Sequence, residues 1–148
     1  MRADLDLVRR LAAADQGLAV VSTTRPDGTV QSSLVNAGVF DHPLTKEPTV
    51  AFVARADTYK LRLIAGAGRA NAVFRAGWEW VSVEGPVDLL GPDHRRPDFP
   101  AEQIPQLLRD IFTAAGGTHD NWAEYDRVMA EERRTAVFIS PARIITNG

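Results

Sequence analysis

Residues Thr49–Phe74 read TVAFVARADTYKLRLIAGAGRANAVF, a pattern that predicts a buried strand, a short basic helical turn and a second strand. Thr58 can cap the helical turn, and Lys60 and Arg62 follow it directly. A helix N-terminus presents unpaired backbone N–H groups and the positive end of the helix dipole. Because two cationic side chains lie beside those groups, the stretch predicts a binding site for a phosphate.

The chain before this stretch predicts a helix followed by a β-hairpin. Asp4 can cap a helix over Leu5–Ala14 that carries apolar residues on one face. Strands over 17–24 and 29–40 are joined by Arg25-Pro26-Asp27-Gly28. Proline fixes φ and glycine supplies a positive φ, so this tetrapeptide is a strong turn signal.

The chain after this stretch continues with a meander and two helices. Strands are expected over 69–75 and 78–90, with a bulge or bend at Gly85-Pro86 in the second. Two helices, 101–115 and 121–133, then precede a last strand over 135–145. About six strands with helices between them predict a mainly β fold, a small antiparallel barrel with flanking helices, formed as a single domain over 1–148.

The composition narrows the classes of function. The chain has 148 residues, no cysteine and a net charge of −2 with dispersed charges. We therefore expect no disulfide, no thiolate metal site and no nucleic-acid partner. No apolar run approaches the roughly 20 residues that span a bilayer, so no membrane partner is expected. Residues 1–15 mix acidic and basic side chains, whereas a signal peptide has an uninterrupted apolar segment. We therefore expect a cytoplasmic location.

The side chains that usually perform catalysis are poorly placed for it. The three histidines, His42, His94 and His119, fall in predicted loops without ligand spacing, so they are expected to be solvated and no metal site is predicted. The sequence offers no nucleophile motif and no obvious acid–base pair, so no catalytic side chain is assigned. If the protein is an enzyme, a bound cofactor should carry the difficult chemistry.

Two further features admit both a structural and a functional interpretation. Gln31 and Ser33 are polar residues on one face of an otherwise apolar strand. They fit an edge strand, and they equally fit a strand that hydrogen-bonds a planar ring. Trp78 and Trp80 share a face of the next long strand, where they could pack in a core or interface or cover a flat ligand.

The order of these parts resembles the flavin and deazaflavin split-barrel family, also called pyridoxamine-5′-phosphate-oxidase-like, and within it the actinobacterial branch that uses coenzyme F-420. Four segments carry the resemblance and together span most of the chain: LAVVSTTRPDGTVQSSLVN (18–36), VARADTYKLRLIAGAGRANAVF (53–74), GWEWVSVEGPVDL (77–89) and NWAEYDRVMAEERRTAVFISPARI (121–144).

The resemblance implies a six-stranded antiparallel split β-barrel that forms a homodimer with two cofactor sites at the subunit interface. The family's phosphate-binding lysine falls on Lys60 and the arginine that follows falls on Arg62, while the first basic position of the pattern is Thr58 here. The hairpin over 17–40 and the strand that follows it would contact the ring system of the cofactor. The implied cofactor-binding residues are Gln31, Ser33, Val53, Thr58, Lys60, Arg62 and Trp78, the last reaching the cofactor of the partner subunit.

The resulting expectation is an oxidoreductase that uses reduced F-420 to transfer a hydride to a small organic substrate, which the sequence does not identify. One alternative is an FMN-dependent enzyme like the pyridoxamine-phosphate oxidases, although the C-terminal ARIITNG lacks the basic segment associated with that oxidase. The other alternative is a non-catalytic flavin- or haem-binding protein.

Overall fold

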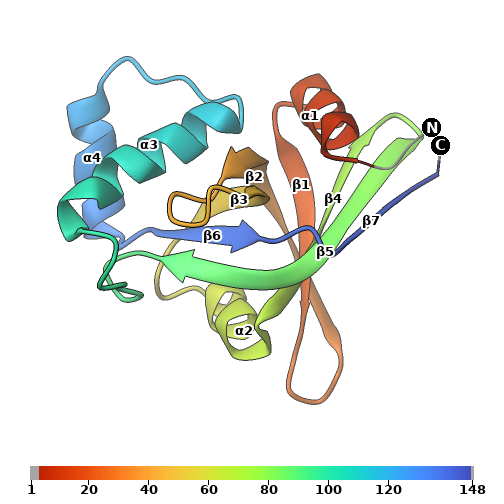
Figure 1. Cartoon of the computed structure of the whole chain (residues 1–148), viewed down its shortest axis with the longest axis horizontal. Helices are drawn as coiled ribbons and strands as arrows, with labels where there is room; N and C mark the ends of the chain where they lie inside the picture. Colours follow the sequence, from red (N-terminus) through yellow and green to blue (C-terminus); the bar gives the residue numbers. More distant parts are fainter. Residues whose placement is uncertain (1–3, 148) are drawn as a thin grey trace.

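Six antiparallel strands close into a barrel in the computed structural model, which describes residues 4–147 (Figure 1). The strand order is β4-β1-β2-β3-β6-β5-β7, and a β4–β5 pairing closes the ring and leaves β7 as an extra strand. The mainly β barrel with flanking helices that the sequence predicted is thus confirmed. The elements are α1 (Leu5–Ala14), β1 (Leu18–Thr24), β2 (Val30–Asp41), β3 (Pro48–Ala54), α2 (Tyr59–Ala67), β4 (Arg69–Ala76), β5 (Glu79–Leu90), a short 3-10 helix (Ala101–Gln103), α3 (Ile104–Ala114), α4 (Trp122–Glu131), β6 (Thr135–Ile139) and β7 (Arg143–Thr146).

Local signals in the sequence account for the element ends. The Asp4 carboxylate accepts a hydrogen bond from the backbone N–H of Leu7 at 3.1 Å and caps α1, as predicted. In the β1–β2 turn, Gly28 has a φ of +87°, which glycine adopts without steric cost, and its N–H donates to the carbonyl of Arg25. α2 is longer than the expected turn and ends at Gly68.

The barrel is split because β2 changes partner along its length. Residues from Val30 to Asn36 pair with β1, whereas residues from Ala37 to Asp41 pair with residues 48–52 of β3. β3 then pairs with β6 through Ala54. Among the described strands, none lies opposite the free side of 30–36. An opening therefore forms between the first half of β2 and the end of β3, next to the start of α2.

The prediction of one continuous last strand over 135–145 is wrong, because the chain forms two strands there, β6 and β7. The chain turns at Ser140-Pro141, where the proline offers no N–H to a ladder, so β6 and β7 pair with different halves of β5. β5 bends between these halves (Figure 1), as the Gly85-Pro86 pair predicted. A Cβ at Gly85 would lie 1.8 Å from the Ser140 carbonyl oxygen, so the close approach requires glycine.

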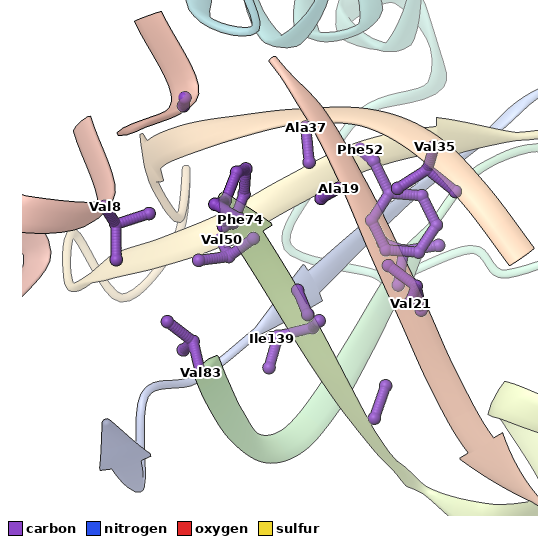
Figure 2. Packing of buried hydrophobic residues seen from close by; sticks show 14 of the residues in the cluster. Val8, Ala19, Val21, Val35, Ala37, Val50, Phe52, Phe74, Val83 and Ile139 are labelled. Atoms are coloured by element: carbon purple, nitrogen blue, oxygen red, sulfur yellow. The ribbon is translucent and has the colours of Figure 1, made fainter. Parts of the chain in front are cut away.

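Two apolar clusters hold the elements together. The larger fills the barrel with residues such as Phe52 and Phe74, and the buried faces of α1 and α2 close its two ends (Figures 1 and 2). The smaller lies outside the barrel, where α3 and α4 pack over β3 and β6 around Phe138 and Ile111. At roughly 25 cal/mol per Å² of buried apolar area, such clusters supply most of the stabilisation of a domain this size. No helix of residues 4–147 is long and apolar enough to cross a membrane.

Candidate functional site

A pocket of about 350 Å³ opens beside the split in the barrel. Its walls come from β2, the end of β3, the first turn of α2, both outer helices and the residue before β6, so it joins parts of the chain that are distant in sequence. The lining residues are Leu34, Val35, Asn36, Val53, Lys60, Ile111, Phe112, Tyr125, Met129 and Arg134.

Lys60 provides the first positive charge of the pocket. It lies in the first turn of α2 and its side chain is half-buried. Burial lowers the pKa of Lys60 below its ordinary value, and the nearby Arg134 guanidinium lowers it further. Within residues 4–147 no carboxylate pairs with this ammonium, so the charge is available to an anion from outside.

Arg134 provides the second positive charge from the other end of the chain. Its Nε and Nη2 atoms lie 2.9 and 2.8 Å from the same carboxylate oxygen, Oε1 of Glu132. The other carboxylate oxygen of Glu132 lies 3.9 Å from Arg55. The Glu132 carboxylate is therefore shared by Arg134 and Arg55. The positive charge around the pocket exceeds the negative charge.

The wall opposite β2 is aromatic and apolar. The Phe112 and Tyr125 rings lie 5.2 Å apart with an interplanar angle of 36°, and Met129 and Ile111 complete the surface. The Tyr125 hydroxyl donates to the Leu108 carbonyl at 3.1 Å, and burial raises the pKa of Tyr125 to about 12. Tyr125 is thus a fixed, neutral wall residue, and such a wall suits a flat ring.

The β2 side of the site contains polar atoms that lack partners. Gln31 Oε1 and Ser33 Oγ are buried, and neither has a hydrogen bond in the described chain. Buried polar atoms without partners cost about 1–3 kcal/mol each, so they are expected to meet a partner in the working protein. These two residues lie on the strand that borders the pocket but do not line it, whereas Asn36 does and is already bonded to the carbonyls of Gln16 and Ala115.

The structure brings together only part of the predicted set. Val53 and Lys60 share the pocket. Thr58 Oγ1 caps α2 by accepting from the Leu61 N–H and donates to the Arg55 carbonyl, so it has no free hydrogen for a phosphate. Arg62 donates to the Asp57 carbonyl at 3.3 Å and lies over the Tyr59 ring, outside the pocket lining.

Trp78 lies in the turn before β5 rather than in the strand, because β5 begins at Glu79. Its side chain is 94% exposed and is not part of the pocket. A contact with a cofactor bound to another subunit would need such exposure, and that contact stays a prediction.

Eight of the ten pocket residues were not among the predicted site residues: Leu34, Val35, Asn36, Ile111, Phe112, Tyr125, Met129 and Arg134. The shared face of Tyr125 and Met129 on a predicted helix was visible, but nothing in the sequence indicated which part of the barrel that face covers. Arg134 follows a run of charged residues and carries no signal that separates it from Arg133.

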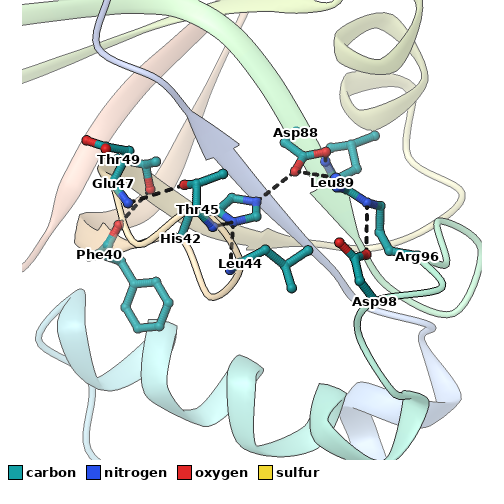
Figure 3. Close-up of polar contacts among 10 residues, drawn as sticks. All are labelled: Phe40, His42, Leu44, Thr45, Glu47, Thr49, Asp88, Leu89, Arg96 and Asp98. Carbon is teal, nitrogen blue, oxygen red and sulfur yellow. Dashed lines mark hydrogen bonds and ion pairs between the residues drawn. The ribbon is translucent and has the colours of Figure 1, made fainter.

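His42 is not the solvated loop residue that was expected. It follows β2, as predicted for a loop, but it is buried and hydrogen-bonded to Asp88 (Figure 3). His94 and His119 are half-buried in loops. In the described part of the chain, no group of three or more histidine, aspartate or glutamate side chains could hold a metal ion.

Comparisons with known proteins find the same architecture in several solved structures. No protein-family model and no curated protein matches the chain. A conserved hypothetical protein from Mycobacterium tuberculosis aligns with a TM-score of 0.64 at 16% identity, over 93% of this chain and 81% of that one. A pyridoxamine 5′-phosphate oxidase-related, FMN-binding protein from Nostoc punctiforme gives 0.64 at 14% identity, over 95% and 78%. An F-420 reductase gives 0.61 at 15% identity, over 89% and 91%.

These likenesses show the fold. The chain has the split-barrel fold of the pyridoxamine-5′-phosphate-oxidase-like proteins, as the resemblance predicted.

Proposed function

We propose that this protein is an oxidoreductase whose pocket between β2 and the outer helices holds a phosphate-bearing tricyclic cofactor, coenzyme F-420. The half-buried, unpaired ammonium of Lys60 is the observation that carries this proposal. A free cation in a partly buried site costs stability unless an anion neutralises it. The aromatic wall beside it suits the ring system of the same ligand.

The residues of the chain fit such a group in three ways. Lys60 would bind the phosphate, and Gln31 and Ser33, which lie on β2 beside the pocket, would bond the polar edge of a ring that extends past the pocket lining. Val53 and the apolar wall would exclude water from the reacting face. Reduced F-420, when bound, supplies the hydride. The side chains would therefore orient cofactor and small organic substrate, with the proton coming from solvent.

We also propose that the working form is a homodimer. On the outer face of the barrel, Leu34 is 62% exposed, lies opposite Val20 at 42%, and the same row of the sheet reaches Ile145 at 48%. Exposed apolar rows of this kind mark interfaces. Leu34 also lines the pocket, so a second subunit on this face would cover the ligand as well.

A titration decides the cofactor. The purified protein is titrated with F-420 and with FMN while the fluorescence of each is followed, and a tighter complex with F-420 is expected. A clear preference for FMN, or a yellow protein as isolated, would replace the proposal with an FMN-dependent enzyme of the same fold, for which the FMN-binding Nostoc protein is a precedent. If neither cofactor binds, the oxidoreductase proposal is wrong. The expected cytoplasmic location stays a prediction.

A further inference from the structure

We propose that Arg134, and not Arg62, is the second cation that binds the ligand's phosphate, so that Lys60 and Arg134 together hold that phosphate group. The inference rests on the proposed function, because it concerns the same pocket. It replaces the Lys60–Arg62 pair that the family pattern implies.

Position in the pocket is the first reason. Lys60 from the start of α2 and Arg134 from the residue before β6 both line the cavity, whereas Arg62 does not. The two cations are close enough that Arg134 lowers the pKa of Lys60. Two like charges at one partly buried site are unfavourable for the empty protein, and an anionic phosphate between them lowers that cost.

The bonding state of Arg134 is the second reason. Its side chain is 27% exposed, and Glu132 holds it through Nε and Nη2 on a single oxygen. Nη1 has no hydrogen-bond partner within residues 4–147, so one end of the guanidinium fork is available to a ligand. Since Glu132 fixes the rest of the side chain, little conformational entropy remains to be lost when a ligand binds.

The local charge balance is the third reason. Lys60, Arg134 and Arg55 carry three positive charges around the single carboxylate of Glu132, which leaves a net charge of about +2. The phosphate monoester of FMN carries about −1.5 to −2 at neutral pH and the phosphate diester of F-420 carries a single negative charge, so either phosphate lowers this excess.

Arg62 is already engaged elsewhere. It donates to the Asp57 carbonyl, and its guanidinium lies 5.9 Å from the centre of the Tyr59 ring. Arg25 lies at 6.0 Å from the same ring and hydrogen-bonds the Tyr59 hydroxyl. The three side chains form a surface cluster at the tip of the β1–β2 hairpin, so Arg62 serves the packing of that hairpin against α2.

FMN and riboflavin provide the test, because they share a ring and differ by one phosphate. Binding of each is measured by calorimetry to the wild type, Arg134→Gln, Lys60→Gln and Arg62→Gln. Arg134→Gln and Lys60→Gln should each weaken FMN binding by about tenfold to a hundredfold, the range for hydrogen bonds to charged groups, and leave riboflavin binding unchanged. Arg62→Gln, the matched control, should change FMN binding by less than about threefold.

The inference is overturned if Arg134→Gln binds FMN like the wild type, if Arg62→Gln loses more affinity than Arg134→Gln, or if riboflavin binding falls as much as FMN binding. Arg134→Lys keeps a charge without the fork, and partial retention of FMN affinity in this variant would support the direct contact. Circular dichroism shows whether each variant is folded. If Arg134→Gln is not folded, the comparison is made with Arg134→Lys instead.

A second probe separates this inference from the proposed function. Pyrophosphate contains the phosphate chemistry without any ring, and its saturable effect on the melting temperature is measured for the same variants. If no flavin or deazaflavin binds but pyrophosphate stabilises the wild type and Arg62→Gln, and not Arg134→Gln or Lys60→Gln, the anion site stands while the oxidoreductase proposal fails. If pyrophosphate and FMN both discriminate none of the variants, the anion site fails.

Discussion

The Nε2 atom of His42, at the end of β2, lies 2.7 Å from Oδ2 of Asp88 on β5 (Figure 3). The ring's other nitrogen, Nδ1, accepts hydrogen bonds from the backbone N–H groups of Leu44 and Thr45. Because Nδ1 is an acceptor, Nε2 is the atom that donates to Asp88. Asp88 is also 2.9 Å from Arg96, so one buried ring joins the β2–β3 loop to β5 and the loop that follows it.

We expect His42→Ala to lower the free energy of unfolding by about 1–3 kcal/mol, because it leaves buried donors and a carboxylate without their partner. The ring also packs against Phe138, with centroids 4.5 Å apart, which adds a packing loss. Urea denaturation measures the change. His94→Ala, in a half-buried loop, is the control and should stay within about 0.5 kcal/mol of the wild type. Equal stabilities of the two variants would show that the His42 contacts contribute nothing to the free energy of unfolding.

The same histidines should be dispensable for the chemistry. None of them lines the pocket, so single replacements of His42, His94 and His119 should leave hydride transfer within about tenfold of the wild type. Loss of a general acid or base costs about 10²–10⁴-fold. Stopped-flow oxidation of the reduced cofactor with an accepting substrate makes the measurement. A hundredfold loss in one folded variant with normal cofactor affinity would place that residue in the active site.

The bend of β5 makes a second stability prediction. An added methyl at Gly85 would meet the Ser140 carbonyl oxygen at 1.8 Å, so Gly85→Ala must shift the β6–β7 connection. The expected loss is about 1–3 kcal/mol or more. Gly66→Ala is the matched control, because Gly66 lies in α2 with open space around it and alanine favours helix by about 0.8–1 kcal/mol. Thermal denaturation should therefore shift in opposite directions, and a shared direction would contradict this reading of β5.

Local chemistry explains why much of the fold was predictable. The caps Asp4 and Thr58 and the Pro26–Gly28 turn act within a few residues, so the sequence shows them directly. The break between β6 and β7 was missed because it depends on β5: the chain turns at 140–142 to pair with both halves of a strand that bends at Gly85.

Tertiary placement explains what could not be predicted about the site. Lys60 and Arg134 are far apart in the sequence, and only the pairing of the start of β6 with the end of β3, which leads into α2, brings them to one pocket. Arg62 follows Lys60 by two residues, but two residues along a helix turn the side chain by about 200°, which points it to another face. His42 looked like a loop histidine because its burial depends on Asp88 of a distant strand.

The exposed apolar row of the barrel predicts the oligomeric state. We expect sedimentation to give a species of twice the 16.2 kDa chain mass at micromolar concentration. Val20→Lys places a charge in the middle of the row and should yield monomers, because burying an unpaired charge at an interface costs several kcal/mol. Val30→Lys is the control, an exposed valine beside the hairpin turn and outside this row. A wild-type monomer, or a Val20→Lys dimer of normal affinity, would rule out this face as the interface.

The buried charge of Lys60 predicts a conflict between stability and binding. Its pKa is lower in the folded protein than in the unfolded chain, so unfolding takes up protons at pH values between the folded-state pKa and about 10.4, the ordinary lysine value. Stability from this group is therefore present above that pH and is lost as pH falls through the folded-state pKa.

At pH 7 the charge opposes folding, and Lys60→Met should raise the stability of the ligand-free protein. The gain should be no more than about 1 kcal/mol, because solvent screens a half-exposed charge. The advantage over wild type should shrink as pH rises toward 10 in thermal denaturation, whereas Arg62→Met should show no such trend. The same Lys60→Met variant should bind FMN about tenfold to a hundredfold more weakly than the wild type. If Lys60→Met is less stable than the wild type at pH 7, Lys60 has a stabilising partner in the folded chain, and its charge is not free to bind an anion.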